Sequence, residues 1–339
     1  MTTPSSQPPQ AILMQMLFGF APARAISIVA ELGIADLLTD GSKTADELAL
    51  KTNSHPRSLY RLLRACTSVG IFSEDSDKRF SLSSMAEFLK SDHPESLRAF
   101  AVMMAHAEQF QTWSAMDYSV RTGTPAFDQV HGMPIFEYYP KHPTSGQIFN
   151  DAMTSMSLGS SIAVINAYDF SGVQKLVDIG GGHGFLLATI LKKYPTMTGI
   201  LYDTTPIVEE SKELLEKHGV DDRCETIGGN FFEAAPSGGD AYMMKHIIHD
   251  WSDAECVTIL KNCRKGITEG GKLLVIEMVV PTGNEPSLSK LLDLQMLAVL
   301  PGCERTEAEY NKLFREAGFQ LTKIIPTMSP YSVIEGVAM

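Results

Sequence analysis

The apolar residues between positions 12 and 101 recur at the spacing of amphipathic helices. In segment 55–70 they lie three and four positions apart and form one apolar face that Gly70 closes. The members of that face are Leu59, Leu62, Leu63, Cys66 and Val69. Two short segments, 71–74 and 79–82, enclose a polar turn and predict a β-hairpin. Helices followed by a hairpin predict a winged-helix arrangement.

After position 170 the pattern changes to strand-length apolar segments that alternate with helical ones. The predicted strands are 175–179, 198–203, 240–247, 273–280, 319–325 and 331–339. Such alternation is typical of a doubly wound, Rossmann-like α/β domain with a mostly parallel sheet. Because the last two strands leave no room for a helix between them, we expect a terminal hairpin and one antiparallel strand. The intervening segment, rich in aromatic residues and Met, predicts helices that bridge the two domains and line a ligand pocket.

Length and composition agree with a globular protein of two domains. The chain has 339 residues, 44% of them hydrophobic and 20% charged, and a formal net charge of −12. This acidity argues against a nucleic acid or an anionic membrane as a partner. Five scattered cysteines without a CxxC pair predict free thiols in a reducing compartment. The chain shows neither a basic signal-peptide start nor a membrane-length apolar run, so we expect a cytoplasmic protein with a disordered tail over 1–10.

A winged helix can bind DNA, or it can be a packing and dimerisation module. The candidate recognition helix carries Arg57, Arg61 and Arg64, but the acidic chain offers no extended basic stripe. The helices before it are more apolar than one buried face requires, which favours burial against a partner chain. We therefore expect homodimerisation through residues 11–101, a helical bridge over 102–169 and a catalytic domain over 170–339.

The strongest chemical signal is a glycine-rich loop at the end of the strand 175–179. Its sequence, Asp178-Ile-Gly180-Gly-Gly182-His-Gly184, lets the backbone approach a ligand at the start of a helix. The loop lacks the Gly-Lys-Ser/Thr of a phosphate-binding Walker loop, and its third glycine does not fit a dinucleotide fingerprint. The ligand is therefore expected to lack a pyrophosphate. The next strand ends in Asp203, where a carboxylate can bind ribose hydroxyls.

A second group of polar residues follows the strand 240–247. Lys245, His246, His249 and Asp250 cluster at the edge of the sheet where ligands bind in this fold class. Glu277, inside an otherwise apolar strand, is costly to bury without a partner, and a histidine imidazole would supply one.

Together these motifs resemble the S-adenosylmethionine-dependent O-methyltransferases of the plant caffeate type and their bacterial relatives. The resemblance covers nearly the whole chain and rests on the segments VDIGGGHG, LYD, GGNFF, KHIIHDWSD, LLVIEMVVP and CERT. It implies that S-adenosylmethionine is bound by Asp178, Gly180, Gly182, Asp203, Asn230, Phe231 and Lys245. Asn230 stands where the family has an acid, so its amide would bind the adenine amino group without charge assistance.

The resemblance also implies a reaction and its residues. His249 matches the general base, and Glu277 and Glu304 match the two acids that orient it. The family's acceptor-lining positions correspond to Phe149, Met153, Asp250 and Met296. A small hydroxylated acceptor would be methylated without a metal, leaving S-adenosylhomocysteine.

Two alternatives stay open at this point. The same fold hosts S-adenosylmethionine-binding enzymes that do not methylate, and a winged helix with a ligand domain can be a small-molecule regulator. A nicotinamide dehydrogenase is disfavoured by the glycine spacing.

Overall fold

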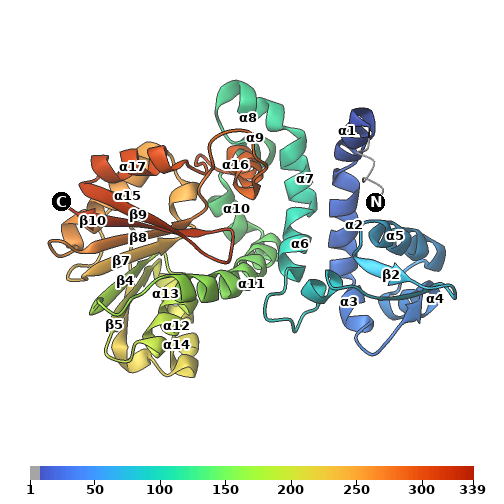
Figure 1. Ribbon diagram of the computed structural model, residues 1–339, viewed down its shortest axis with the longest axis horizontal. Coiled ribbons are helices and arrows are strands. Elements are labelled where there is room, and N and C mark those ends of the chain that lie inside the picture. Colours follow the sequence, from blue (N-terminus) through green and yellow to red (C-terminus); the bar gives the residue numbers. More distant parts are fainter. Residues whose placement is uncertain (1–7) are drawn as a thin grey trace, which may run out of the picture. The chain divides into compact units, whose positions relative to one another are not determined.

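The computed structural model describes residues 8–339, which form two compact units (Figure 1). The first unit comprises the chain up to residue 111 together with 139–156, and the second comprises 112–138 and 157–339. The predicted disordered tail lies outside the described residues as far as residue 7, and helix α1 already begins at Pro9.

The first unit is helical with a small three-stranded sheet. Its elements are α1 (Pro9–Leu17), α2 (Phe20–Glu31), α3 (Ile34–Leu37), β1 (Lys43–Thr44), α4 (Ala45–Thr52), α5 (Pro56–Ser68), β2 (Phe72–Glu74), β3 (Arg79–Leu82) and α6 (Arg98–Met104). The predicted hairpin is confirmed as β2 and β3, and β1 pairs antiparallel with β3 on its other side. On α5 the residues Leu59, Leu63 and Cys66 of the predicted apolar face are buried, whereas Leu62 is half-buried and Val69, just after the helix, is exposed.

Helices fill the segment between the wing and the large sheet, as predicted. They are α7 (Ala107–Ser114), α8 (Met116–Thr122), α9 (Ala126–His131), α10 (Ile135–Lys141) and the 25-residue α11 (Pro143–Ala167). The part of α11 up to Met156 belongs to the first unit, and the remainder belongs to the second.

A seven-stranded sheet organises the second unit. Its strands are β4 (Lys175–Ile179), β5 (Thr198–Asp203), β6 (Cys224–Gly228), β7 (Ala241–Lys245), β8 (Lys272–Glu277), β9 (Phe319–Pro326) and β10 (Ser332–Ala338). The spatial order is β6-β5-β4-β7-β8-β10-β9, and β10 runs antiparallel to both of its neighbours. The predicted α/β fold with one antiparallel strand is confirmed. Strand order reverses between β4 and β7, where ligands bind in open sheets of this kind.

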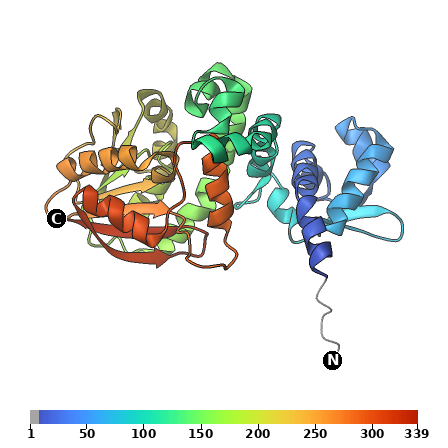
Figure 2. The same ribbon diagram turned by 90° about the horizontal axis from the view of Figure 1, so that it is seen from above.

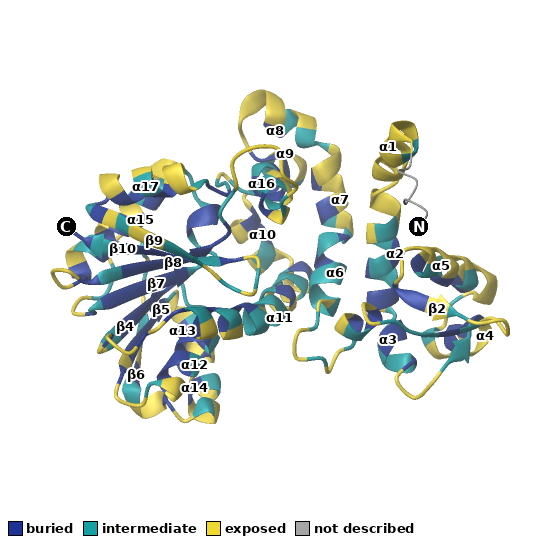
Figure 3. Ribbon diagram, in the orientation of Figure 1, coloured by how far each residue is buried: buried dark blue, intermediate teal, exposed yellow. Residues whose placement is uncertain are grey.

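Helices cover both faces of this sheet because side chains alternate along each strand (Figures 1 and 2). One face packs on α12 (Phe185–Lys193), α14 (Lys212–His218) and the last turns of α11. The other packs on α15 (Asp253–Gly266) and α17 (Glu307–Glu316). The central strands are buried along nearly their whole length (Figure 3). The remaining helices are α13 (Thr205–Glu210) and α16 (Leu288–Val299).

Two strands end earlier than the sequence pattern predicts. β8 stops at Glu277, which is therefore the last residue of the strand and not an interior one. Val279 makes a separate parallel bridge to Arg305, because the chain leaves the sheet after Glu277. β7 stops at Lys245, since His246 adopts a left-handed φ of 57° that turns the chain away. The edge strand β6 is an addition to the predicted set.

None of the described helices is by itself long and apolar enough to cross a membrane. The bent pair α1 and α2, with 43° between them, passes a test of length and composition together.

Candidate functional site

The glycine loop connects β4 to α12 at the carboxyl edge of the sheet. Gly180 (φ 65°) packs against the side chain of Ile247, so a Cβ there would displace that residue. Gly182 (φ 58°) has no protein atom within 4 Å of where its Cβ would be, so its loop position is open. The Gly182 N–H donates to Oδ2 of Asp203 at 2.9 Å, which joins the loop to the end of β5. The structure thus places Gly180, Gly182 and Asp203 together, as predicted for one ligand.

Two ionisable groups of opposite charge lie near the ends of neighbouring strands: Asp178 on β4 is buried, and Lys245 on β7 is half-buried. Asp178 is 2% exposed, and a Cβ on Gly181 would come within 2.6 Å of its Oδ2. Burial raises the pKa of Asp178 to about 7, although the Lys245 ammonium acts in the opposite direction. Burial likewise lowers the pKa of Lys245 to about 8, and its Nζ donates to the Ser157 hydroxyl at 2.9 Å. Lys245 is therefore an ammonium group that loses its proton more readily than an ordinary lysine, at the end of the strand next to that of the glycine loop.

Asn230 and Phe231 follow β6 on the far side of Asp203. The amide oxygen of Asn230 accepts the Phe232 N–H at 3.0 Å, and its NH₂ group donates to Glu233. The oxygen keeps one further lone pair for a ligand. The Phe231 ring lies 6.1 Å from that of Trp251, and a Cβ on Gly180 would lie 3.7 Å from Cε1 of Phe231.

The turn after β7 is built around one carboxylate. Oε1 of Glu277 accepts the backbone N–H groups of Ile247, Ile248 and His249 at 2.9, 3.0 and 3.4 Å. The left-handed His246 lets these three donors converge on a single atom. Glu277, fully buried, thus has a backbone partner that the sequence did not suggest.

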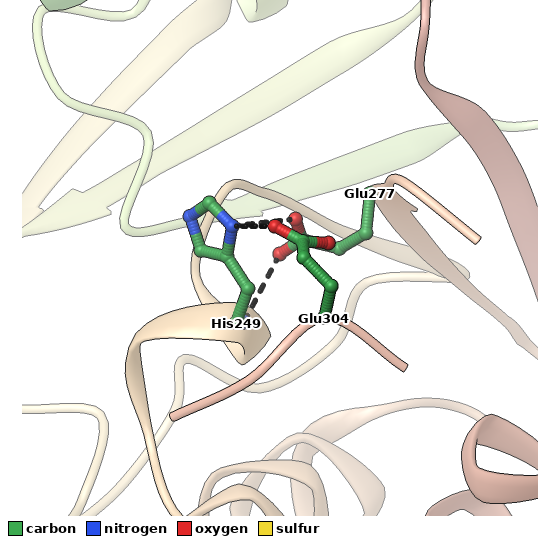
Figure 4. Close-up of side chains that lie close together, drawn as sticks. All are labelled: His249, Glu277 and Glu304. Atoms are coloured by element: carbon green, nitrogen blue, oxygen red, sulfur yellow. Dashed lines mark hydrogen bonds and ion pairs between the residues drawn. The ribbon is translucent and has the colours of Figure 1, made fainter. Parts of the chain in front are cut away.

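His249 lies on this turn, and carboxylates contact both of its ring nitrogens. Nδ1 is 2.8 Å from Oε1 of Glu304 and 3.5 Å from Oε2 of Glu277, while Nε2 points away from both acids (Figure 4). On that outer side, Nε2 is 3.4 Å from Oδ1 of Asp250. The structure therefore brings together His249, Glu277, Glu304 and Asp250 from three separate parts of the chain.

The electrostatics favour a proton on the imidazole. Burial lowers the pKa of His249, but Glu277, Asp250 and Glu304 outweigh it and raise the pKa above the ordinary value. Burial also raises the pKa of Glu277, and burial raises that of Asp250 to about 6. His246, whose ring lies 5.6 Å from that of His249, has a pKa well below the ordinary value because it is buried beside cations. His246 is thus a neutral neighbour of a charged or readily charged base.

The predicted acceptor residues fall in two places. Met296 is buried on α16 and Asp250 is on the turn after β7, both in the second unit. Phe149 and Met153 are on the part of α11 that belongs to the first unit, where Phe149 stacks on Tyr139 with ring centroids 4.7 Å apart. The acceptor-binding role of these four residues stays a prediction.

Two residues close to Glu304, Gly302 and Arg305, contact the turn of His249 and were not predicted. Arg305 is 1% exposed and donates to the carbonyl groups of Ile248 and Trp251. A Cβ on Gly302 would come within 2.5 Å of the backbone of Asp250 and Trp251. No periodic pattern marks either contact, because each depends on backbone atoms about 50 positions away.

The same three side chains also have the composition of a metal site. Nδ1 of His249 and one oxygen each from Glu277 and Glu304 lie within 4.8 Å of one another. Imidazole and carboxylate groups are common ligands of zinc and other first-row metals. The 2.8 Å contact between His249 and Glu304 gives these atoms a hydrogen-bonded arrangement that needs no ion.

Fold and site define an α/β methyltransferase class, and comparison with known proteins gives the family. A family model of the O-methyltransferase domain matches residues 113–320, and one of the O-methyltransferase dimerisation domain matches 14–92. The phenazine O-methyltransferase PhzM of Lysobacter antibioticus is 40% identical over 97% of this chain and 96% of its own length. The mitomycin biosynthesis 6-O-methyltransferase of Streptomyces lavendulae is 36% identical over 94% of this chain and 92% of its own.

Solved structures agree with this result. CalO1, a methyltransferase of calicheamicin biosynthesis in its S-adenosylhomocysteine-bound form, matches with a TM-score of 0.88 and 32% identity over 97% of this chain and 98% of its own. The chain belongs to the S-adenosylmethionine-dependent O-methyltransferase family and carries the family's dimerisation domain ahead of its catalytic domain.

Proposed function

We propose that this enzyme methylates a hydroxyl group of a small aromatic acceptor, with His249 as the general base and S-adenosylmethionine as the methyl donor. The observation that carries the proposal is the geometry of His249. Its Nδ1 is held by two buried acids, while its Nε2 points away from them. An imidazole fixed in this way is suited to accept a proton at Nε2.

The residues around the glycine loop fit a nucleoside with a short charged tail. Gly182 offers an open approach at the loop, and Asp203 ends the neighbouring strand with a carboxylate suited to ribose hydroxyls. Asn230 would accept from the adenine amino group, Phe231 would border the base, and Asp178 and Lys245 would hold the methionine end. When bound, S-adenosylmethionine supplies an electrophilic methyl group on a sulfonium.

The protein's part in the reaction is to take a proton and to align the acceptor oxygen. Before transfer, Nδ1–H of His249 donates to Glu304 and leaves the Nε2 lone pair free for the acceptor hydroxyl. As the proton arrives, the imidazolium is stabilised by Glu304 and Glu277. A phenol has a pKa near 10, so the acids that raise the pKa of His249 also reduce the cost of the transfer. Asp250, beside Nε2, would help to orient the hydroxyl.

The acceptor class follows from the relatives' names. One acts on a phenazine and another in mitomycin biosynthesis, so we infer a polycyclic or substituted aromatic hydroxyl compound. A panel of a hydroxyphenazine, a naphthol, a catechol and an aliphatic alcohol, with radiolabelled methyl donor, tests this. Turnover of the aliphatic alcohol alone would contradict the inference.

The role of His249 as the general base can be tested by replacing it with glutamine. His249→Gln should bind S-adenosylhomocysteine as the unchanged enzyme does, because His249 is not among the residues proposed to hold the cofactor. Its kcat with the best panel acceptor should fall roughly 10²–10⁴-fold, the usual contribution of a general base. Calorimetry and single-turnover methyl transfer measure the two effects. Full turnover by His249→Gln would rule out the assignment.

The second prediction concerns metals. Because hydrogen bonds already join His249 to its acids, we expect dialysis against EDTA to leave kcat unchanged. Elemental analysis of the dialysed enzyme provides the control for complete removal. A loss of activity that Zn²⁺ or Mg²⁺ restores would instead show that these three side chains hold an ion.

A further inference from the structure

The largest side chain that is fully buried in the described part of the chain is an arginine, Arg305. Burying a guanidinium is costly unless its donors are satisfied. Arg305 directly follows Glu304 and lies 57 positions from the carbonyl that it binds on the turn of His249. Its contacts therefore join the base to one of the acids that orient it.

Apart from the nearby Cys303 carbonyl, which accepts from Nη1 at 3.3 Å, the groups that the Arg305 side chain binds lie on or beside the turn of His249. Its Nη1 donates to the carbonyl of Ile248 at 2.8 Å, and its Nη2 donates to the carbonyl of Trp251 at 2.9 Å. These two carbonyls flank His249 and Asp250 on both sides. Nε and Nη2 also donate to Oδ1 of Asp253, at the start of α15, at 3.1 and 3.0 Å. The planar guanidinium thus holds three points of one short turn in fixed positions.

The backbone around Arg305 is fixed as firmly as its side chain. The Arg305 carbonyl accepts the Val280 N–H at 2.9 Å, just beyond the strand that ends in Glu277. The Glu304 N–H donates to Asp293 on α16 at 2.9 Å. The segment 302–305 therefore carries Glu304. It is hydrogen-bonded to the chain just beyond the strand of Glu277, and it binds the turn of His249 through the Arg305 side chain.

We propose that Arg305 is a positioning residue for methyl transfer, which holds the turn of His249 so that Nδ1 stays in contact with Glu304 and Glu277. This inference rests on the proposed role of His249 as the base. The residue acts through the turn and does not itself touch the acceptor. A lysine in its place keeps the positive charge but cannot reach both carbonyls with one planar group.

The matched control is another arginine that binds backbone carbonyls. Arg223 donates to the carbonyls of Leu191 and Met197 at 3.1 and 2.8 Å. Leu191 is in the last turn of α12 and Met197 directly precedes β5, so both carbonyls lie at the amino edge of the sheet, opposite to the turn of His249. Arg305→Lys and Arg223→Lys therefore lose the same kind of bond in different places.

The test measures the titration of His249 by NMR on protein labelled at histidine and saturated with S-adenosylhomocysteine. The resonance is assigned by its absence in His249→Gln. Glu277, Glu304 and Asp250 face the ring, together with His246, so a loosened turn weakens the attraction of the acids. We expect the His249 midpoint in Arg305→Lys to fall by about one pH unit or more, and that in Arg223→Lys to stay unchanged.

Kinetics provide the second readout. With the panel acceptor that is turned over fastest, kcat of Arg305→Lys should fall about tenfold or more, as expected when a reacting group is misplaced by a fraction of an ångström. KM and the affinity for S-adenosylhomocysteine should stay close to those of the unchanged enzyme. An unchanged midpoint and kcat in Arg305→Lys would overturn the proposal, even if the melting temperature falls.

A further variant covers the case in which Arg305→Lys does not fold. Asp253, whose side chain is 55% exposed, holds the other end of the guanidinium, and Asp253→Asn removes that charge at little risk to folding. We expect a smaller shift of the His249 midpoint in the same direction, and no shift would overturn the proposal. Retained turnover in His249→Gln would instead contradict the proposed base, so the two failures are distinguishable.

Discussion

At the scale of single residues, the site is governed by the surplus of acids around His249. Three carboxylates, from Glu277, Asp250 and Glu304, act on one imidazole. Oε2 of Glu277 and Oε2 of Glu304 are buried and accept no hydrogen bond from the described residues. Nδ1 of His249 lies within 3.5 Å of both acids, so the free enzyme favours the protonated imidazole. The neutral imidazole that the proposed mechanism needs then becomes available as the pH rises.

This surplus predicts the pH dependence of the reaction. In the proposed mechanism methyl transfer requires neutral His249, and the acids raise its pKa, so we expect kcat/KM to rise with pH and to be lost as pH falls through that raised value. We expect the midpoint of this acid limb to lie above about 6.5, the ordinary value for histidine.

Glu304→Gln provides the check on the cause of this limb. The amide can still accept from Nδ1 but carries no charge, so the limb should move to lower pH and kcat should fall. Rate profiles from pH 5 to 10 at saturating methyl donor measure both effects. A limb that stays in place in Glu304→Gln would contradict the electrostatic explanation.

The residues of this site could be predicted from the sequence more easily than the hydrogen bonds between them. The glycine loop is local, because a strand, glycines and a helix follow one another within a few positions. His249, Glu277 and Glu304 stand out in the sequence as a histidine after a strand and two distant acids, and the resemblance to a family assigns a role to each. The bonds of Glu277 to three backbone N–H groups depend on the left-handed His246, which no composition or spacing reveals.

At the scale of elements, the turn of His249 and the loop between α16 and α17 pack so closely that there is no room for a side chain at Gly302. This loop passes the turn of His249, residues 246–251, at Gly302. A Cβ there would come within 2.5 Å of Asp250 C and Trp251 N, and closer still to the carbonyl oxygen of His249. Backbone atoms of a packed turn cannot give way as the end of a flexible side chain can.

Gly302→Ala should therefore both destabilise the enzyme and impair catalysis. Overpacking of this kind costs about 1–3 kcal/mol, and the displaced turn should lower kcat as well. Gly172→Ala is the matched control, because a Cβ at Gly172 meets nothing within 4 Å. Denaturant unfolding and kcat measure the two effects. A Gly302→Ala enzyme as stable and as active as Gly172→Ala would show that the turn can move freely.

Most helices and strands could be predicted from the repeat of apolar residues, with a period of about two residues in strands and about 3.6 in helices. The hairpin, the face of α5 and the main strands of the sheet could be predicted because each pattern is local. The early end of β8 could not, since apolar residues continue to Val280 after the chain has left the sheet. The edge strand β6 is half-exposed and short, so its apolar signal is weak.

At the scale of the whole molecule, the first helix presents an unusually apolar surface. Leu13, Met16, Leu17 and Phe18 are between 57% and 70% exposed. Monomeric proteins rarely expose such a continuous patch, and the dimerisation-domain model covers residues 14–92. We infer that the enzyme is a homodimer that covers α1.

The double change Leu13→Glu and Leu17→Glu tests this, because the two residues lie on one face of α1, one turn apart. Four carboxylates brought into a symmetric apolar interface should dissociate the dimer and halve the mass found by light scattering. Leu50→Glu, at a residue that is 86% exposed on α4, should leave the mass unchanged. A double variant with the mass of the unchanged enzyme would contradict the inference.

The position of β10 has a consequence for how the sheet folds. β10 follows β9 in the sequence but lies between β8 and β9, and it pairs with both. Until β10 has paired, β8, with Glu277 at its end, keeps an open edge. A folding intermediate in which residues 332–338 are unpaired therefore exposes a strand edge beside Glu277, and such an edge favours aggregation.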